Sequence, residues 1–323
     1  MGPSEKACIA HIPPAGLHVT EDTEAAAEET TTASERNPRL LPLLHFSDEQ
    51  FPAFTGVSKN VLQFFLCRIG NSVRDSSPRS IGRETKLTLV LVKLKLNVPF
   101  VTLAGMFGVG QSRVEGLFLE GFEPLAKVAK DLIVWYNRAT IQSRMPASFK
   151  ALLPTCRAII DASEVECSRP TCHPVKRVKT PTQFKTHKFL VANAPSGEIL
   201  FVSKAFGGRC TDTELTVKSG FCDLLEPGDT ILADKGFPSI GARLADKGGL
   251  LVMPPFKKGQ KSFQFSKAQN EDGYKIASVR VLVERAIQRM KGFQCLDFVR
   301  PEMCDHFDDT LVIICGICNL YMT

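Results

Sequence analysis

Three acidic side chains lie where a buried element would normally carry apolar residues. Asp161 interrupts an apolar, strand-like run, Asp234 directly follows another, and Glu284 lies in the middle of a predicted helix. A buried carboxylate costs several kcal/mol unless it is paired, hydrogen-bonded or bound to a metal. Three acids brought together could bind divalent cations, and two such ions about 4 Å apart can activate water to cleave a phosphodiester. Each acid taken alone has a plainer interpretation, as a turn residue or a solvated helix position.

The predicted helix over 276–291 turns Glu284 away from its apolar side. Its apolar stripe consists of Val279, Val283, Ile287 and Met290. Glu284 shares a different face with Arg280, Gln288 and Lys291. Those bases could hold a phosphate or pair with the carboxylate.

The chain around these acids divides into regions of different pattern. Residues 45–135 are predicted to be helical, with a strong helix over 83–96 that ends before Asn97-Val98-Pro99. Residues 136–155 are a linker. Short runs rich in Val, Ile and Phe predict strands over 156–165, 188–194, 198–205, 230–233 and 248–254, and helices are predicted over 212–225, 276–291 and 308–322. This order predicts a mixed α/β domain over 156–323.

Composition limits the function classes. The net charge is +6, and because residues 1–40 carry more acids than bases, the basic excess lies in the rest of the chain and favours a polyanionic partner. We interpret 1–44 as a disordered acidic tail, since it is rich in Ala, Glu and Thr. Eleven scattered cysteines favour a reducing compartment over a disulfide framework. We predict no membrane span, because the longest apolar runs are too short.

The stretch over 101–117 has the spacing of a helix-turn-helix. A small residue, Ala104, is followed by the turn Gly108-Val109-Gly110 and by an apolar anchor, Val114. The exposed start of the second helix would then carry the predicted DNA-binding residues Gln111, Ser112 and Arg113. An ordinary helical hairpin remains the alternative.

Two basic stretches flank the acidic positions. The segment over 167–197 contains bases and no acid, and a second group of lysines lies over 257–267. Such stretches suit a phosphate backbone. The candidate phosphate contacts are Lys176, Arg177, Lys179, Lys185, Lys188, Lys257 and Lys258. The alternative is that they are only solvated surface.

Other motifs are weak. Cys167, Cys172 and His173 have only loosely zinc-like spacing without a second pair. Cys315 and Cys318 lie in an apolar run and are interpreted as buried core thiols. The sequence contains neither a phosphate-binding G-x-x-x-x-G-K-[ST] loop nor a G-x-S-x-G nucleophile motif.

A family resemblance links the acidic positions. Short motifs follow one another over 150–323: 159–164 (IIDASE), 189–191 (FLV), 201–204 (FVSK), 208–215 (GRCTDTEL), 225–229 (LEPGD), 233–237 (ADKGF), 254–256 (PPF) and 283–291 (VERAIQRMK). In these motifs and their order, residues 150–323 resemble the Harbinger/PIF-type transposase-derived DDE endonuclease family. The segment over 180–188 is shorter than the corresponding family segment.

The resemblance implies a ribonuclease H-like fold with an upstream helix-turn-helix, Mg²⁺ or Mn²⁺ as cofactor, and DNA as substrate. It implies that Asp161, Asp234 and Glu284 are the catalytic triad and that Asp212 is a further acid near the metal. Asp212 has an alternative role as the N-cap of a helix.

We therefore predict a metal-dependent DNA endonuclease of transposase type. The alternative is a domesticated DNA- or partner-binding protein that has lost cleavage. The resemblance further implies a nuclear location, while a separate DNA-binding partner protein and homo-oligomerisation are left open.

Overall fold

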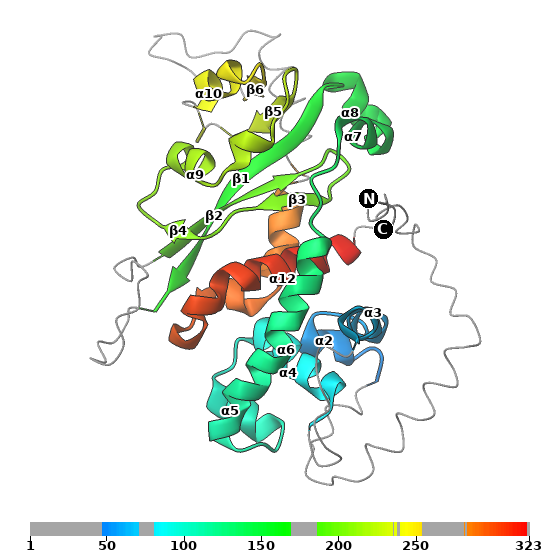
Figure 1. Cartoon of the computed structure of the whole chain (residues 1–323), viewed down its shortest axis with the longest axis vertical. Helices are drawn as coiled ribbons and strands as arrows, with labels where there is room; N and C mark the ends of the chain where they lie inside the picture. The colour runs from blue at the N-terminus through cyan, green and yellow to red at the C-terminus, as the bar shows by residue number, and fades with distance from the viewer. Residues whose placement is uncertain are drawn as a thin grey trace, which may run out of the picture.

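The computed structural model describes residues 47–70, 81–168, 186–234, 236–237, 240–253, 281 and 283–321, apart from the side chain of Ser148. The N-terminal helices gather at one end of the molecule, and the sheet with further helices around it lies at the other, with α12 (Phe307–Leu320) between them (Figure 1). The predicted tail over 1–44 lies outside the described residues.

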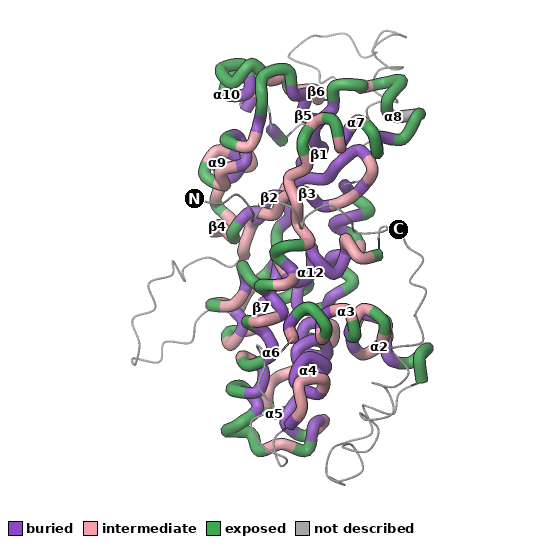
Figure 2. Tube along the Cα trace, turned by 45° about the vertical axis from the view of Figure 1, so that its right-hand side comes forward, coloured by how far each residue is buried: buried purple, intermediate pink, exposed green. Residues whose placement is uncertain are grey.

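The helical end is built around one fully enclosed helix. Its elements are α2 (Phe51–Thr55), α3 (Lys59–Ile69), α4 (Arg83–Leu96), α5 (Phe100–Met106) and α6 (Gln111–Asp131). The predicted bounds of α4 are confirmed: the helix ends where Asn97 adopts a left-handed conformation (φ 49°), and Pro99 precedes the next helix. Residues Thr85 to Leu94 of α4 are buried, and only the ends of the helix are partly exposed (Figure 2). Its interior position encloses two lysines, Lys86 paired with Glu120 and Lys93 paired with Glu302, each at 2.8 Å.

The segment over 136–155, predicted as a linker, contains two short helices. They are α7 (Arg138–Arg144) and α8 (Ala147–Leu152). The Asn137 side chain caps α7 by accepting a hydrogen bond from the backbone N–H of Thr140 at 2.9 Å. The linker is therefore ordered and leads directly into the first strand.

The sheet follows the predicted strand pattern closely. Its strands are β1 (Cys156–Cys167), β2 (Thr186–Asn193), β3 (Ile199–Val202), β4 (Phe206–Gly207), β5 (Thr230–Ala233), β6 (Leu250–Val252) and β7 (Phe298–Val299). The strand order is β3-β2-β1-β5-β6, with β4 beside β2 and β7 beside β1. Strand β2 pairs antiparallel with β1 on one side and with β3 on the other. Strands β5 and β6 continue the sheet in parallel with β1, and β7 also pairs in parallel with β1.

Helices cover the sheet on both sides. On one side lie α9 (Asp212–Lys218) and the 3-10 turn η4 (Phe221–Leu224), and α10 (Ile240–Asp246) packs against α9 and β6. On the other side lies α12 (Phe307–Leu320), preceded by the 3-10 turns η5 (Gln294–Leu296) and η6 (Pro301–His306). Alternation along β2 defines the sides, because Lys188 contacts α9 while Phe189 faces Phe307 of α12. Figure 1 shows α9 and α12 apart on different sides of the strands.

The predicted fold class is confirmed: a mixed sheet flanked by helices, with the strand order of a ribonuclease H-like fold, preceded by a helical region. One crossover was not predicted, namely α10, which connects the parallel strands β5 and β6.

One continuous core joins the helical end to the sheet. Helix α12 packs closely on α6, and a Cβ atom on Gly316 would lie only 2.8 Å from the carbonyl oxygen of Ala129. Glycine at this position therefore permits the close approach of the two helices. None of the described helices is both long and apolar enough to cross a membrane.

Candidate metal centre

Two of the predicted acids lie at neighbouring positions of the sheet. Strands β1 and β5 run parallel, and Ile160 lies opposite Ala233. Asp161 directly follows Ile160, and Asp234 directly follows Ala233. Adjacent strands are separated by about 4.8 Å, and matched positions face the same side. The register thus brings the two aspartates side by side at the end of β5.

Both aspartates keep access to solvent. Each is only partly buried. The Oδ1 atom of Asp161 accepts a hydrogen bond from the backbone N–H of Ala162 at 2.9 Å. Asp161 lies opposite Val191 of β2, so it belongs to the side of the sheet that α12 covers. Two adjacent, partly exposed carboxylates at a strand end have the oxygen donors that Mg²⁺ and Mn²⁺ prefer.

Glu284 lies on a helix attached to the same side. The predicted helix is present at 281 and 283–291, and its apolar stripe is buried at Val283, Ile287 and Met290. The Sγ atom of Cys315 in α12 lies 3.8 Å from the Sδ atom of Met290, which fixes this helix against α12. Glu284 itself is exposed on the opposite face, as predicted.

The three acids do not form a closed metal cage. Within the part of the chain that the structure describes, no three His, Cys, Asp or Glu side chains gather as metal ligands would. The strand register sets Asp161 beside Asp234, and among the described side chains Glu284 does not complete a three-residue ligand group with them. Val279 and Arg280, which we placed on the same helix, lie outside the described residues.

Asp212 has a different environment from the one predicted. It is the first residue of α9, and the N-cap is Thr211, whose hydroxyl accepts from the backbone N–H of Glu214 at 3.2 Å while Glu214 caps in return. The N-cap interpretation of Asp212 is therefore wrong by one residue. Threonine takes this role because its hydroxyl reaches the third backbone N–H of the helix.

Asp212 forms an ion pair with Lys188 instead of remaining open. The Nζ atom of Lys188 lies 2.5 Å from Oδ1 of Asp212, and both side chains are largely buried. Lys188 belongs to the side of the sheet that α9 covers, opposite to that of Asp161. The Oδ2 atom of Asp212 nevertheless approaches the loop after Asp234, where it lies 2.5 Å from the position of a Cβ on Gly236. The ammonium of Lys188 thus has a carboxylate partner in this structure, and the predicted phosphate contact at Lys188 stays a prediction.

The predicted DNA-binding positions are only partly described. Helix α5, a turn at Phe107–Gly110 and helix α6 occur where the helix-turn-helix spacing predicts them, and Gln111, Ser112 and Arg113 are exposed at the start of α6. The other predicted basic contacts lie outside the described residues: Lys176, Arg177, Lys179, Lys185, Lys257 and Lys258.

The thiols are buried in the core, as predicted. Cys315 and Cys318 are enclosed in α12, and burial raises the pKa of the Cys318 thiol to about 12. A thiolate is the form that binds metals. Cys167 is the last residue of β1 and is partly buried, while Cys172 and His173 lie outside the described residues.

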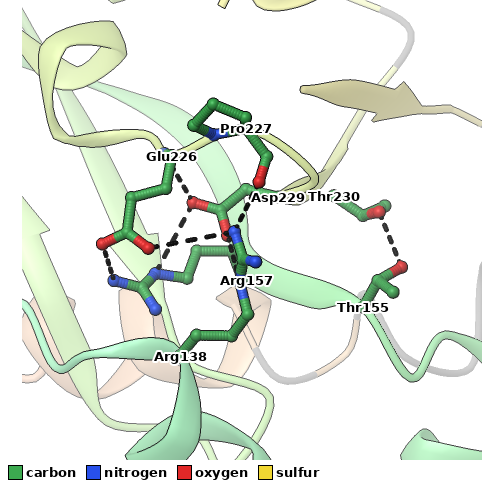
Figure 3. Close-up of polar contacts among 7 residues, drawn as sticks. All are labelled: Arg138, Thr155, Arg157, Glu226, Pro227, Asp229 and Thr230. Atoms are coloured by element: carbon green, nitrogen blue, oxygen red, sulfur yellow. Dashed lines mark hydrogen bonds and ion pairs between the residues drawn. The ribbon is translucent and has the colours of Figure 1, made fainter. Parts of the chain in front are cut away.

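Sequence reasoning missed one polar cluster in the sheet. Arg157, Asp229 and Arg138 meet at the beginning of β1 and β5 (Figure 3). The available signal was an arginine within an apolar strand followed by an aspartate before another strand.

Comparison with known protein families identifies the kind of domain in which the acids lie. Residues 160–319 match the family model of the DDE superfamily endonucleases. The matched stretch contains Asp161, Asp212, Asp234 and Glu284. This match supports a transposase-derived protein of the DDE type.

Among solved structures, the chain is similar to one in the crystal structure of a pre-cleavage Mos1 transpososome. The two share 12% sequence identity over 65% of this chain and 79% of that chain, with a TM-score of 0.20. No curated protein sequence matches this chain.

Proposed function

We propose that this protein is a metal-dependent DNA endonuclease of the Harbinger/PIF transposase type. The observation that carries the proposal is the β1–β5 register, which sets Asp161 beside Asp234 inside the stretch that matches DDE endonucleases. Two adjacent, partly exposed carboxylates concentrate negative charge that a hard cation would neutralise.

Asp161 and Asp234 would hold the cation, and Glu284, supplied by the helix on the same side of the sheet, is the proposed third ligand. When bound, Mg²⁺ or Mn²⁺ supplies Lewis-acid activation of a water and of the scissile phosphate. The protein contributes by fixing the two aspartates on paired strands, so little reorganisation is needed when the cation and DNA arrive.

DNA would be selected by the helical region. Gln111, Ser112 and Arg113 are exposed at the N-terminal end of α6, where backbone N–H groups and a base can meet phosphates. The helical region over 45–135 and the sheet domain over 156–323 share one core, so a DNA contact on α6 is rigidly connected to the acidic pair through α12.

A second candidate function is DNA binding without cleavage. It is favoured by the absence of a three-acid cluster among the described side chains and by the Lys188–Asp212 ion pair. This alternative retains the helical region and needs no cation.

Nicking of supercoiled plasmid by the full chain with Mn²⁺ separates the two functions. The nuclease proposal expects nicked product from the wild type, no product from Asp161→Asn, and unchanged activity from Asp246→Asn, an exposed aspartate on α10. Wild-type nicking by Asp161→Asn would contradict the nuclease proposal. Plasmid binding without nicking by the wild type would favour the second candidate.

A further inference from the structure

Strand β1 contains an irregularity shortly before the acidic pair. Against β5, Cys156 lies opposite Thr230, whereas Ala158 lies opposite Ile231. Arg157 is therefore an extra residue of β1, which defines a β-bulge. Bulges are rare between parallel strands and are over-represented next to active sites, where they re-aim side chains.

The bulge decides which residues of the two strands become neighbours. With it, Ile160 lies opposite Ala233, and Asp161 falls beside Asp234. Without it, the pairing at the start of the strands would run on unshifted, and Ile160 would lie beside Asp234. A one-residue slip also turns every side chain to the other face of the sheet. The two carboxylates face the same side only because one residue is added to β1.

The added residue carries a charge into the interior. The Arg157 side chain is only 1% exposed, and its Nε atom lies 3.8 Å from Oδ2 of Asp229, which is fully buried. Its Nη2 atom lies 3.9 Å from Glu226, and its guanidinium lies over the ring of Trp135 at 5.2 Å from the centroid. Figure 3 shows Arg157 and Arg138 converging on the Asp229 carboxylate.

Burying the Arg157 guanidinium costs free energy of desolvation that its contacts do not fully offset. Among the described residues, neither Nε nor Nη1 of Arg157 has a hydrogen-bond partner, and the same holds for Nε1 of the neighbouring Trp135. Ion pairs longer than hydrogen bonds seldom repay the desolvation of both charges. A buried group in this state calls for a reason other than stability.

Asp229 connects the bulge to its surroundings. Its Oδ1 atom accepts hydrogen bonds from Nε (3.1 Å) and Nη2 (2.9 Å) of Arg138 in α7, and Oδ2 accepts from the backbone N–H of Glu226 at 2.9 Å. Arg138 also donates to the carbonyl oxygen of Pro227 at 2.8 Å. The start of β5 is thus held by the linker helix, and Arg157 holds β1 to the same carboxylate.

We propose that Arg157 is a positioning residue that maintains the bulge through Asp229 and thereby places Asp161 beside Asp234. As far as catalysis is concerned, this inference rests on the proposed nuclease function. The register itself does not depend on that function. Arg157 acts through the backbone of β1 and does not touch the cation or the DNA.

Disulfide trapping measures the register directly. Paired positions on neighbouring strands have Cα atoms about 5 Å apart, within the range for a disulfide. The double variant Asp161→Cys/Asp234→Cys should cross-link under mild oxidation, as detected by mass spectrometry of the joined peptides. The double variant Ile160→Cys/Asp234→Cys should not, because those side chains leave opposite faces.

Arg157→Met in both cysteine backgrounds is the decisive test. Methionine keeps the length and apolar body, and Asp229 keeps its pairing with Arg138, so we expect the variant to fold. Cross-linking should then fall for the 161–234 pair and rise for the 160–234 pair. Lys86→Met, which removes an equally buried cation from α4, should lower only the stability. Should Arg157→Met not fold by circular dichroism, Asp229→Asn, which removes the opposing charge, replaces it.

Mn²⁺ titration of the variants without engineered cysteines separates the two proposals. Arg157→Met should weaken Mn²⁺ binding by about 10- to 100-fold, as loss of a supporting residue around a metal site does. Unchanged cross-linking in Arg157→Met or in Asp229→Asn overturns the positioning role. If the wild type itself does not bind Mn²⁺ but the 161–234 cross-link still depends on Arg157, the nuclease proposal is overturned and the positioning role remains.

Discussion

The ammonium group of Lys188 lies 2.5 Å from Oδ1 of Asp212, on the side of the sheet away from Asp161. The pair lies close to the loop after Asp234, because Oδ2 of Asp212 approaches Gly236. A lysine therefore already neutralises one of the four acids that the family resemblance groups together. The acid that remains next to Asp161 is Asp234.

This arrangement predicts unequal effects on metal binding. Asp234→Asn should lower the affinity for Mn²⁺ by more than about 100-fold, because loss of an outer supporting residue already costs about 10- to 100-fold. Asp212→Asn should change the Mn²⁺ affinity by less than about twofold. Lys188 compensates the charge of the Asp212 carboxylate, so this carboxylate contributes little electrostatic potential on the face of the sheet that carries Asp161. Isothermal titration calorimetry measures both. Equal losses in the two variants would contradict the separation of the two acids.

The Lys93–Glu302 pair predicts a pH dependence of stability. Burial alone would raise the pKa of the Glu302 carboxyl, but the hydrogen bond and charge of Lys93 outweigh it and lower the pKa below 4.5. The stabilisation from Glu302 is therefore present above pH 4.5 and is lost as the pH falls through the lowered pKa. Glu302→Gln should cost roughly 3 kcal/mol near neutral pH, because it leaves a buried ammonium unpaired.

Urea unfolding of the wild type and Glu302→Gln from pH 3 to pH 7 tests this prediction. The difference in unfolding free energy between them should shrink below pH 4.5. Taking the difference at each pH removes the opposite contribution of Glu84, whose pKa is raised by burial. A difference that stays constant down to the lowest pH would show that the ion pair does not link Lys93 to Glu302 as described.

The close contact of α6 and α12 predicts a strong effect of one methyl group. Gly316→Ala places a Cβ 2.8 Å from the backbone oxygen of Ala129, so the helices must separate, at a cost of about 1–3 kcal/mol. Gly116→Ala is the matched control, because a Cβ there meets nothing within 4 Å, and it should stabilise α6 by up to about 1 kcal/mol. Thermal melts of both variants give the comparison, and a neutral Gly316→Ala would refute the tight packing.

The exposed start of α6 predicts a phosphate contact at Arg113. Arg113→Ala should weaken DNA binding and reduce the slope of log affinity against log salt by about 1. Lys127→Ala, exposed farther along the same helix, should leave both unchanged. Fluorescence anisotropy at several salt concentrations provides the slope. An effect of Lys127→Ala as large as that of Arg113→Ala would argue for diffuse charge in place of a defined contact.

Local pattern predicted much of the fold but little of the site geometry. The bounds of β5 and α4 could be predicted from runs of apolar residues and from the residues that end those runs. Turns and helix ends depend on residues that are close in the sequence, so a single sequence reveals them. Helix α10 was missed because its seven residues, IGARLAD, are too few for a clear helical period. A crossover was nevertheless required between parallel strands.

The relationships between distant residues were not readable from the sequence. Asp161 was placed in a predicted strand and Asp234 directly after another, but the alignment of the two depends on the bulge at Arg157. A bulge cannot be recognised from the alternation of apolar and polar residues along a strand. Lys188 and Asp212 were assigned separate partners because nothing local indicates that β2 and α9 meet. The burial of Lys86 and Lys93 in α4 was not predicted either, because their partners Glu120 and Glu302 lie far away in the sequence.

The most direct measurement is the anomalous diffraction signal of Mn²⁺ in crystals of the full chain grown with that ion. The account predicts a peak within coordination distance, about 2.2 Å, of carboxylate oxygens from both Asp161 and Asp234. Crystals that contain Mn²⁺ yet show no peak between these two side chains, or show it only beside Asp212, would contradict it.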